Sequence, residues 1–224
     1  MSMMTNLFSV FDPTTSVGMS FNWLAMTLGL LIFPTTKLVG SSRITNMYMM
    51  LFKSLNKEIS PILLLENKVT YIIFLALFFF ILWNNLMGLL PFIFTPTSHL
   101  VITLSLALPL WLGYFSYGWI YNFKNMLAHL TPQGTPAFLS PFMVVIESVS
   151  SLIRPGTLAI RLMANMIAGH LLLTLVSETI NIFSFSSAVV IVVLQILLII
   201  LEVAVAMIQA YVLVVLSVLY VSEI

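Results

Sequence analysis

The chain has 224 residues, of which 61% are hydrophobic and only 7% are charged, with a mean hydropathy of +1.14 and a formal net charge of +1. A water-soluble domain needs several times more charge, so this composition predicts a protein that lies in a bilayer and gives no indication of nucleic-acid binding. The sequence contains no cysteine, which excludes disulfides, thiol nucleophiles and thiolate metal sites.

Short motifs exclude further kinds of cofactor chemistry. His99, His129 and His170 are 30 and 41 positions apart, too far for two haem ligands on one bundle helix. His99 and His129 fall near the ends of predicted spans, where a solvated role is expected. The phosphate-cradling loop that ends in Gly-Lys-Ser or Gly-Lys-Thr is missing, so no nucleotide chemistry is expected in this chain. We expect neither a cofactor nor a metal ion.

The first part of the chain predicts one membrane span followed by a charged surface helix. The span covers about 17–33, between the turn at Asp12–Thr14 and Pro34. In the segment 37–68, charged residues alternate with apolar ones, and 43–59 is predicted to be an amphipathic helix on the membrane surface. Because lysine and arginine predominate there, we expect this segment on the side from which the protein is inserted and the N-terminus on the other.

Two spans of ordinary length are predicted next, at 70–90 and 99–121. The first contains the pair Asn84 and Asn85, which we expect to make packing contacts rather than to bind an ion. The second contains Pro109, where a kink is expected. After it, a polar turn returns the chain to the basic side of the membrane.

The last part of the chain predicts a hairpin of two unusually long helices, 136–176 and 186–221. At 1.5 Å per residue they would measure roughly 60 and 54 Å, whereas the hydrocarbon core is about 30 Å thick. The second helix lacks proline and glycine, which favours a strongly tilted hairpin. The alternative is a pair of ordinary spans with a break at Pro155-Gly156. The whole chain, 1–224, is predicted to form a single all-α membrane domain.

Helical phase groups the few polar residues of this hairpin. Glu147, Arg154 and Arg161 are separated by seven positions, so they share one face of the first helix. Asn165 lies one turn beyond Arg161 on nearly the same face, whereas His170 lies about half a rotation away. The same seven-residue spacing forms a polar stripe on the second helix, made of Gln195, Glu202 and Gln209.

A fixed charge at Arg161 must be compensated. An arginine at the bilayer centre costs roughly 2.5–3.5 kcal/mol or more, and its guanidinium group cannot lose its proton. The nearby polar residues therefore predict a hydrated, proton-handling path that faces a partner carboxylate. Structural alternatives are the pairing of Arg161 with Glu202 and of Glu147 with Arg154. For His170 and the glutamines, the alternative is a role in helix packing.

Two other classes of function are compatible with the composition. A secondary transporter is expected to contain an internal repeat and interrupted helices around a substrate site, and no repeat is visible. A purely structural membrane subunit of a respiratory complex would explain the apolar sequence. It would not explain the phased charges at Glu147, Arg161 and Glu202.

Five segments then carry a family resemblance: NNLMGLLPF (84–92), SHLVITLSLALPLW (98–111), PQGTP (132–136), RPGTLAIRLMANMIAGHLL (154–172) and LEVAVAMIQAYVLVVLSVLYVSE (201–223). They closely resemble subunit a, also called subunit 6, of the mitochondrial F-type ATP synthases. The resemblance covers most of the chain and is strongest from Asn84 onward, and nothing is carried over to 37–68. The combination of His170 with Glu202 resembles the mitochondrial version, because bacterial relatives tend to have the two groups exchanged.

The resemblance implies a multi-pass protein of the mitochondrial inner membrane and a non-catalytic, proton-translocating stator subunit of the Fo sector. Its partners would be the rotating c-ring, whose carboxylates carry protons, the other stator subunits including the peripheral stalk, and the lipid bilayer. Arg161 matches the essential arginine between two half-channels, and Glu147 the acidic group on the matrix side. The intermembrane-side region matches Asn165, His170, Glu202 and Gln209.

Overall fold

A computed structural model describes residues 7–14, 18–27, 43–61, 68–90, 93–131, 138–180 and 185–222, and within these ranges the chain is helical and contains no β-strand. This confirms the predicted all-α class. The elements are η1 (Leu7–Phe11), η2 (Phe21–Leu24), α2 (Arg43–Ile59), α3 (Lys68–Gly88), η3 (Pro96–Ser98), α4 (Leu100–Tyr121), α5 (Phe123–Leu130), α6 (Ser140–Ile180) and α7 (Phe185–Ser222). Of the predicted span 17–33, residues 18–27 are described, and the rest lies outside the described residues.

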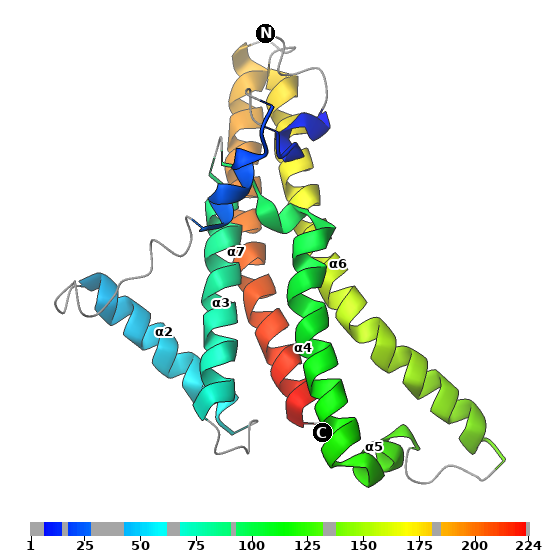
Figure 1. Cartoon of the computed structure of the whole chain (residues 1–224). Helices are drawn as coiled ribbons and strands as arrows, with labels where there is room; N and C mark the ends of the chain where they lie inside the picture. Colours follow the sequence, from blue (N-terminus) through cyan, green and yellow to red (C-terminus); the bar gives the residue numbers. More distant parts are fainter. Residues whose placement is uncertain are drawn as a thin grey trace.

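Helix α2 is amphipathic, and its apolar side contacts α3. Tyr48, Leu55 and Ile59 are buried, and the Tyr48 ring lies 5.8 Å from the Phe79 ring of α3. Its opposite side carries exposed basic and methionine side chains, among them Lys53. Figure 1 shows α2 leaning away from the bundle of α3, α4, α6 and α7. A helix with one apolar and one charged side suits the membrane surface better than the membrane interior.

Helices α6 and α7 form the long hairpin. Helix α6 has 41 residues and α7 has 38, which correspond to lengths of about 62 and 57 Å. The alternative with a break at Pro155-Gly156 is wrong, because α6 continues through Pro155. Likewise α4 continues through Pro109. Two unbroken helices of this length exceed a hydrocarbon layer of about 30 Å, so they must either tilt strongly or extend beyond it. The strong tilt stays a prediction.

The hairpin packs against α3 and α4. Helix α7 packs on α3 and α6, and α6 packs on α4, and Figure 1 shows α6 diverging from α4 toward its own N-terminal end. Ala159 of α6 and Ala210 of α7 are completely buried. Small residues such as these let helices approach closely in a membrane. Bulky apolar residues such as Ile153, Ile160 and Ile200 are exposed on the outer surface of the hairpin, where they can contact lipid or another subunit.

The two asparagines of α3 make packing contacts, as predicted. Asn84 donates a hydrogen bond of 2.8 Å to the Phe80 carbonyl of its own helix. Asn85 is buried and donates one of 3.5 Å to the Ala206 carbonyl of α7. The bond of Asn85 joins α3 to α7, whereas that of Asn84 stays within α3, and the Oδ1 of Asn85 has no hydrogen-bond partner among the described residues. That residues 1–224 form one domain stays a prediction.

Candidate functional site

Arg161 lies midway along α6, and its side chain is exposed on an otherwise apolar surface. Its exposed neighbours include Ile153 and Ile160. Among the residues that the structure describes, Arg161 has no ion-pair partner. It lines a narrow recess between α6 and α7 together with Gln209, and the recess is too small to hold a water molecule. We call it the arginine recess.

Glu202 of α7 is buried at the point where α7 meets α6. Its side chain is only 6% exposed, and neither carboxylate oxygen has a hydrogen-bond partner among the described residues. The carboxyl group packs directly on Gly169, where a Cβ atom would lie 2.7 Å from the Glu202 Cδ. Glycine at 169 therefore makes the space that the carboxylate occupies. The alternative pairing of Glu202 with Arg161 is absent from the structure.

His170 follows Gly169 and is half-buried. Its Nε2 is buried and has no hydrogen-bond partner among the described residues, and the ring also interacts with the backbone of Gly88. The Phe11 ring meets the imidazole edge to face, with 6.2 Å between the ring centroids. Asn165, the remaining predicted site residue of α6, is partly exposed between Arg161 and His170. Arg161 and Gln209 thus line one recess, and Glu202 packs on the residue that precedes His170.

Glu147 and Arg154 form an ion pair of 3.4 Å between Oε1 and Nη2. The seven-residue spacing makes this contact long for an ideal helix, but the flexible arginine side chain spans the two turns. The guanidinium group also lies over the Tyr220 ring of α7, 5.4 Å from its centroid, a cation–π contact. Both members of the pair are partly exposed. The structural alternative for this pair is therefore present, whereas a role of Glu147 in proton transfer stays a prediction.

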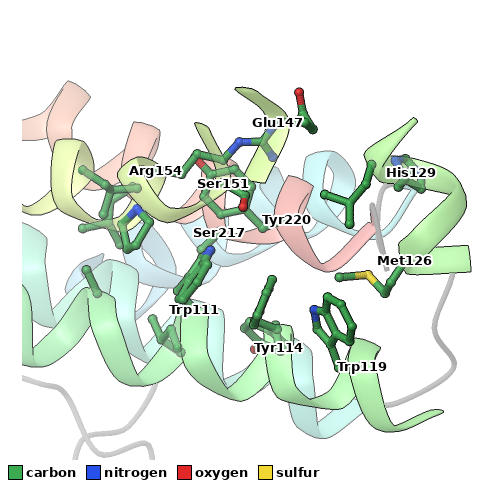
Figure 2. Close-up of a pocket in the computed structure, with 17 residues that line it drawn as sticks. Trp111, Tyr114, Trp119, Met126, His129, Glu147, Ser151, Arg154, Ser217 and Tyr220 are labelled. Atoms are coloured by element: carbon green, nitrogen blue, oxygen red, sulfur yellow. The ribbon is translucent and has the colours of Figure 1, made fainter. Parts of the chain in front are cut away.

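A cavity of about 120 Å³ opens between α4, α5, α6 and α7 beside this ion pair. We call it the inner chamber. Figure 2 shows its aromatic wall, with Trp111, Tyr114 and Trp119 opposite Arg154. Since one water molecule occupies about 30 Å³, the inner chamber has room for a few waters. Its polar lining consists of His129, Glu147, Ser151, Arg154, Ser217 and Tyr220 together with the aromatic polar groups.

Two leucines separate the inner chamber from the arginine recess. Leu158 of α6 and Leu213 of α7 line both spaces. They are 8% and 5% exposed, so each fills its place almost completely. Because an aliphatic side chain offers water no hydrogen bond, the pair forms an apolar partition between a space that can hold water and the fixed cation.

Sequence reasoning missed three features of this region. His99 is not solvated as predicted, because it is partly buried and contacts Phe11. The inner chamber depends on Trp111, Tyr114 and Trp119 of α4, which form no sequence motif that predicts a cavity. Gly169 was visible as a small residue in a bulky helix, a pattern that is typical of close helix contacts, but only the fold identifies Glu202 as the group it accommodates.

The described part of the chain contains four helices long and apolar enough to cross a membrane, and their interior carries arginine, glutamate and histidine. These features define a multi-pass α-helical membrane protein with ionisable groups inside its spanning helices, which marks a functional site. The sequence model of the ATP synthase A chain family matches residues 17–222, and the chain belongs to this family.

Insect proteins are similar to this chain over its full length. It is 55% identical over 224 residues to ATP synthase subunit a of Drosophila melanogaster, covering 99% of this chain and 100% of the relative. The corresponding protein of Aedes aegypti is 51% identical and that of Anopheles gambiae 50%, each over 225 residues with the same coverage. Together with the spanning helices, this relationship confirms the predicted localisation as a multi-pass protein of the mitochondrial inner membrane.

The contact between Gly169 and Glu202 is testable by adding one methyl group. Gly169→Ala places a Cβ against the buried carboxyl group, and such overpacking costs about 1–3 kcal/mol. We expect ATP synthesis by the reconstituted complex to fall sharply. Gly113→Ala is the matched control, because no atom lies within 4 Å of its added Cβ. Equal rates for both variants would contradict the contact.

Proposed function

We propose that this chain is the proton-translocating stator subunit of the Fo sector of an ATP synthase, with Arg161 between two half-channels that lead to a rotating c-ring. The observation that carries the proposal is the exposed guanidinium group of Arg161 on an apolar membrane surface, with no ion-pair partner among the described residues. A charge in this position is stable only beside an anionic group, so a carboxylate of a neighbouring subunit is expected to pass it.

The fixed cation would control protonation of each passing carboxylate. Opposite Arg161, the ionised form is favoured by the nearby positive charge, so the acid releases its proton. Once it has moved away and faces lipid, desolvation favours the neutral acid, and a proton must be taken up first. A cation that never loses its proton also repels protons that would otherwise cross directly. The proton-motive force would thereby bias the direction of rotation.

Two separate groups of residues would supply access from the two sides. On the matrix side, the inner chamber has room for water and has Glu147 in its lining. On the intermembrane side, the path would use Asn165, His170, Glu202 and Gln209. Support comes from Glu202 and the Nε2 of His170, which are buried without hydrogen-bond partners among the described residues and therefore can accept a water molecule or a proton.

The partners follow from the exposed surfaces of the hairpin. The apolar side chains around Arg161 suit a helical ring packed within the membrane, and the c-ring is the expected partner there. The other stator subunits, including the peripheral stalk, would contact the remaining surfaces of the bundle. These partners are carried over from the family to which the chain belongs.

Removal of the cation tests the central step. In Arg161→Ala, coupled ATP synthesis is expected to fall to background, because no fixed charge then favours ionisation of the passing carboxylate. The measurement is proton-driven synthesis by the assembled complex in vesicles, with the amount of assembled complex determined in parallel. Arg43→Ala on the surface helix α2 is the control for loss of one arginine. Preserved synthesis in Arg161→Ala would contradict the proposal.

Retaining the charge but changing its shape tests the role of the guanidinium group. In Arg161→Lys we expect synthesis to fall about tenfold, because an ammonium group lacks the planar donor fork and can lose its proton when it is desolvated. The same vesicle measurement applies. A wild-type rate in this variant would show that charge alone is sufficient.

The apolar partition predicts a separate defect. In the double variant Leu158→Ala and Leu213→Ala, water of the inner chamber gains access to the arginine recess, so passive proton conductance should rise several-fold while synthesis falls. The double substitution to methionine is the control, because it conserves volume and apolar character. The proton conductance of vesicles measures both. Unchanged conductance in the alanine pair would exclude the leucines as a barrier.

A further inference from the structure

We propose that His99 is a positioning residue that anchors an N-terminal cap over His170, and that this cap forms the outer wall of the proton path. The N-terminal cap is defined as the described residues 7–14 and 18–27. The contribution of His170 to proton transfer rests on the proposed function, whereas the anchoring itself rests on contacts within this chain. Figure 1 shows η1 beside the C-terminal half of α6, far from α5.

The anchor is a hydrogen bond between residues 88 positions apart. The Nε2 of His99 lies 3.1 Å from the backbone carbonyl of Phe11, and the ring is partly buried. A carbonyl oxygen only accepts, so Nε2 must carry the proton and donate it. The imidazole also packs against two aromatic rings that contact each other, with centroids 5.1 Å away for Trp23 and 5.3 Å for Phe94. His99 is therefore fixed in position and in tautomer.

Phe11 connects this anchor to the proposed proton path. While His99 holds the carbonyl of Phe11, the side chain of Phe11 meets the His170 ring edge to face at 6.2 Å. The aromatic edge covers one side of an imidazole whose Nε2 has no hydrogen-bond partner among the described residues. Movement of Phe11 would open that side of His170 to water. Three residues, His99, Phe11 and His170, thus form one chain of contacts from loop to cap to hairpin.

The cap has internal contacts that let it act as a unit. The Asp12 carboxylate accepts a hydrogen bond of 3.0 Å from the Thr14 backbone N–H, which lowers the pKa of Asp12. The Asn22 amide donates to the carbonyls of Asp12 and Thr14, at 3.4 and 3.5 Å. These bonds connect the two described parts of the cap. A local anchor at His99 can therefore hold the whole cap in place.

The residues that immediately precede His99 are also held in place by contacts. Ser98 donates a 2.7 Å hydrogen bond to the Thr95 carbonyl, and the two hydroxyl groups are 3.1 Å apart. Thr95 in turn packs against Gly88, where an added Cβ would lie 2.8 Å from the Thr95 Cγ2. The backbone of Gly88 interacts with His170. Residues 95–98 therefore lead into His99 and pack on Gly88, the last residue of α3, which in turn interacts with His170.

A substitution series separates the hydrogen bond from general packing. His99→Ala removes the donor and should lower proton-driven ATP synthesis about fivefold, the population shift expected when one hydrogen bond is lost. His99→Gln keeps an N–H donor on a side chain of similar length, so it should restore most of the rate. Ser105→Ala is the control, because it also removes a hydrogen bond to a backbone carbonyl, but one within a single turn of α4.

A cross-link reports the position of the cap without depending on proton transport. The chain contains no natural cysteine, so a short bifunctional maleimide can join only introduced thiols within this subunit. The pair Phe11→Cys and His170→Cys should cross-link in the assembled complex. Adding His99→Gln should preserve the yield, and adding His99→Ala should lower it about fivefold. The pair Phe11→Cys and Ser116→Cys, at the opposite end of α4, should not react.

Two results would overturn the proposal. The first is an undiminished cross-link in the His99→Ala background. The second is a loss of cross-linking with His99→Gln. This result would contradict the anchor even if the His99→Ala variant failed to assemble. The cross-link keeps this test distinct from the proposed function: an intact anchor together with preserved synthesis in Arg161→Ala would reject the function and leave the anchor standing.

Discussion

The structure depends on keeping one permanent charge, that of Arg161, inside an apolar layer without neutralising it. The guanidinium group lies on the exposed surface of α6, and its neighbour in the arginine recess is the neutral amide of Gln209. An internal carboxylate at that place would have removed the need for an external anion. Glu202 is instead buried against Gly169, with both oxygens free of hydrogen bonds to described residues. The hairpin therefore keeps the carboxylate of Glu202 apart from the guanidinium group of Arg161.

A second arginine of the same helix shows the contrasting arrangement. Arg154 lies two turns before Arg161, but it is paired with Glu147 and lies over the Tyr220 ring. Partial exposure beside a cavity that can hold water makes that pair inexpensive, since exposed ion pairs gain little and cost little. One helical face thus carries a cation that is paired with Glu147 and, two turns further on, a cation with no ion-pair partner among the described residues. Leu158 and Leu213 lie between the two environments.

The sequence predicted the helices well because hydropathy and helical phase are local properties. The surface helix spans Arg43–Ile59, where 43–59 was predicted, and the seven-residue spacing correctly put Glu147 and Arg154 on one face. The unbroken helix favoured across Pro155 is confirmed. The expectation for His99 was wrong, since a hydrogen bond across 88 positions leaves no periodic signal. Helical phase places Gln209 and Glu202 on the same stripe of α7. It therefore could not predict which of the two lies beside Arg161.

The hairpin is longer than the helices beside it, which explains why the end of the hairpin near η1 is covered by the N-terminal cap. Helix α4 has 22 residues, about 33 Å, whereas α6 is about 62 Å long, so α4 can accompany only part of it. Figure 1 shows α6 and α7 extending beyond the ends of α3 and α4 on the side where η1 lies. The N-terminal cap lies where the flanking helices end, and there Phe11 of the cap and Gly88 at the end of α3 meet His170. The hairpin thus extends beyond α3 and α4 near His170, and the proposed anchor, the hydrogen bond from His99 to the carbonyl of Phe11, keeps that imidazole covered.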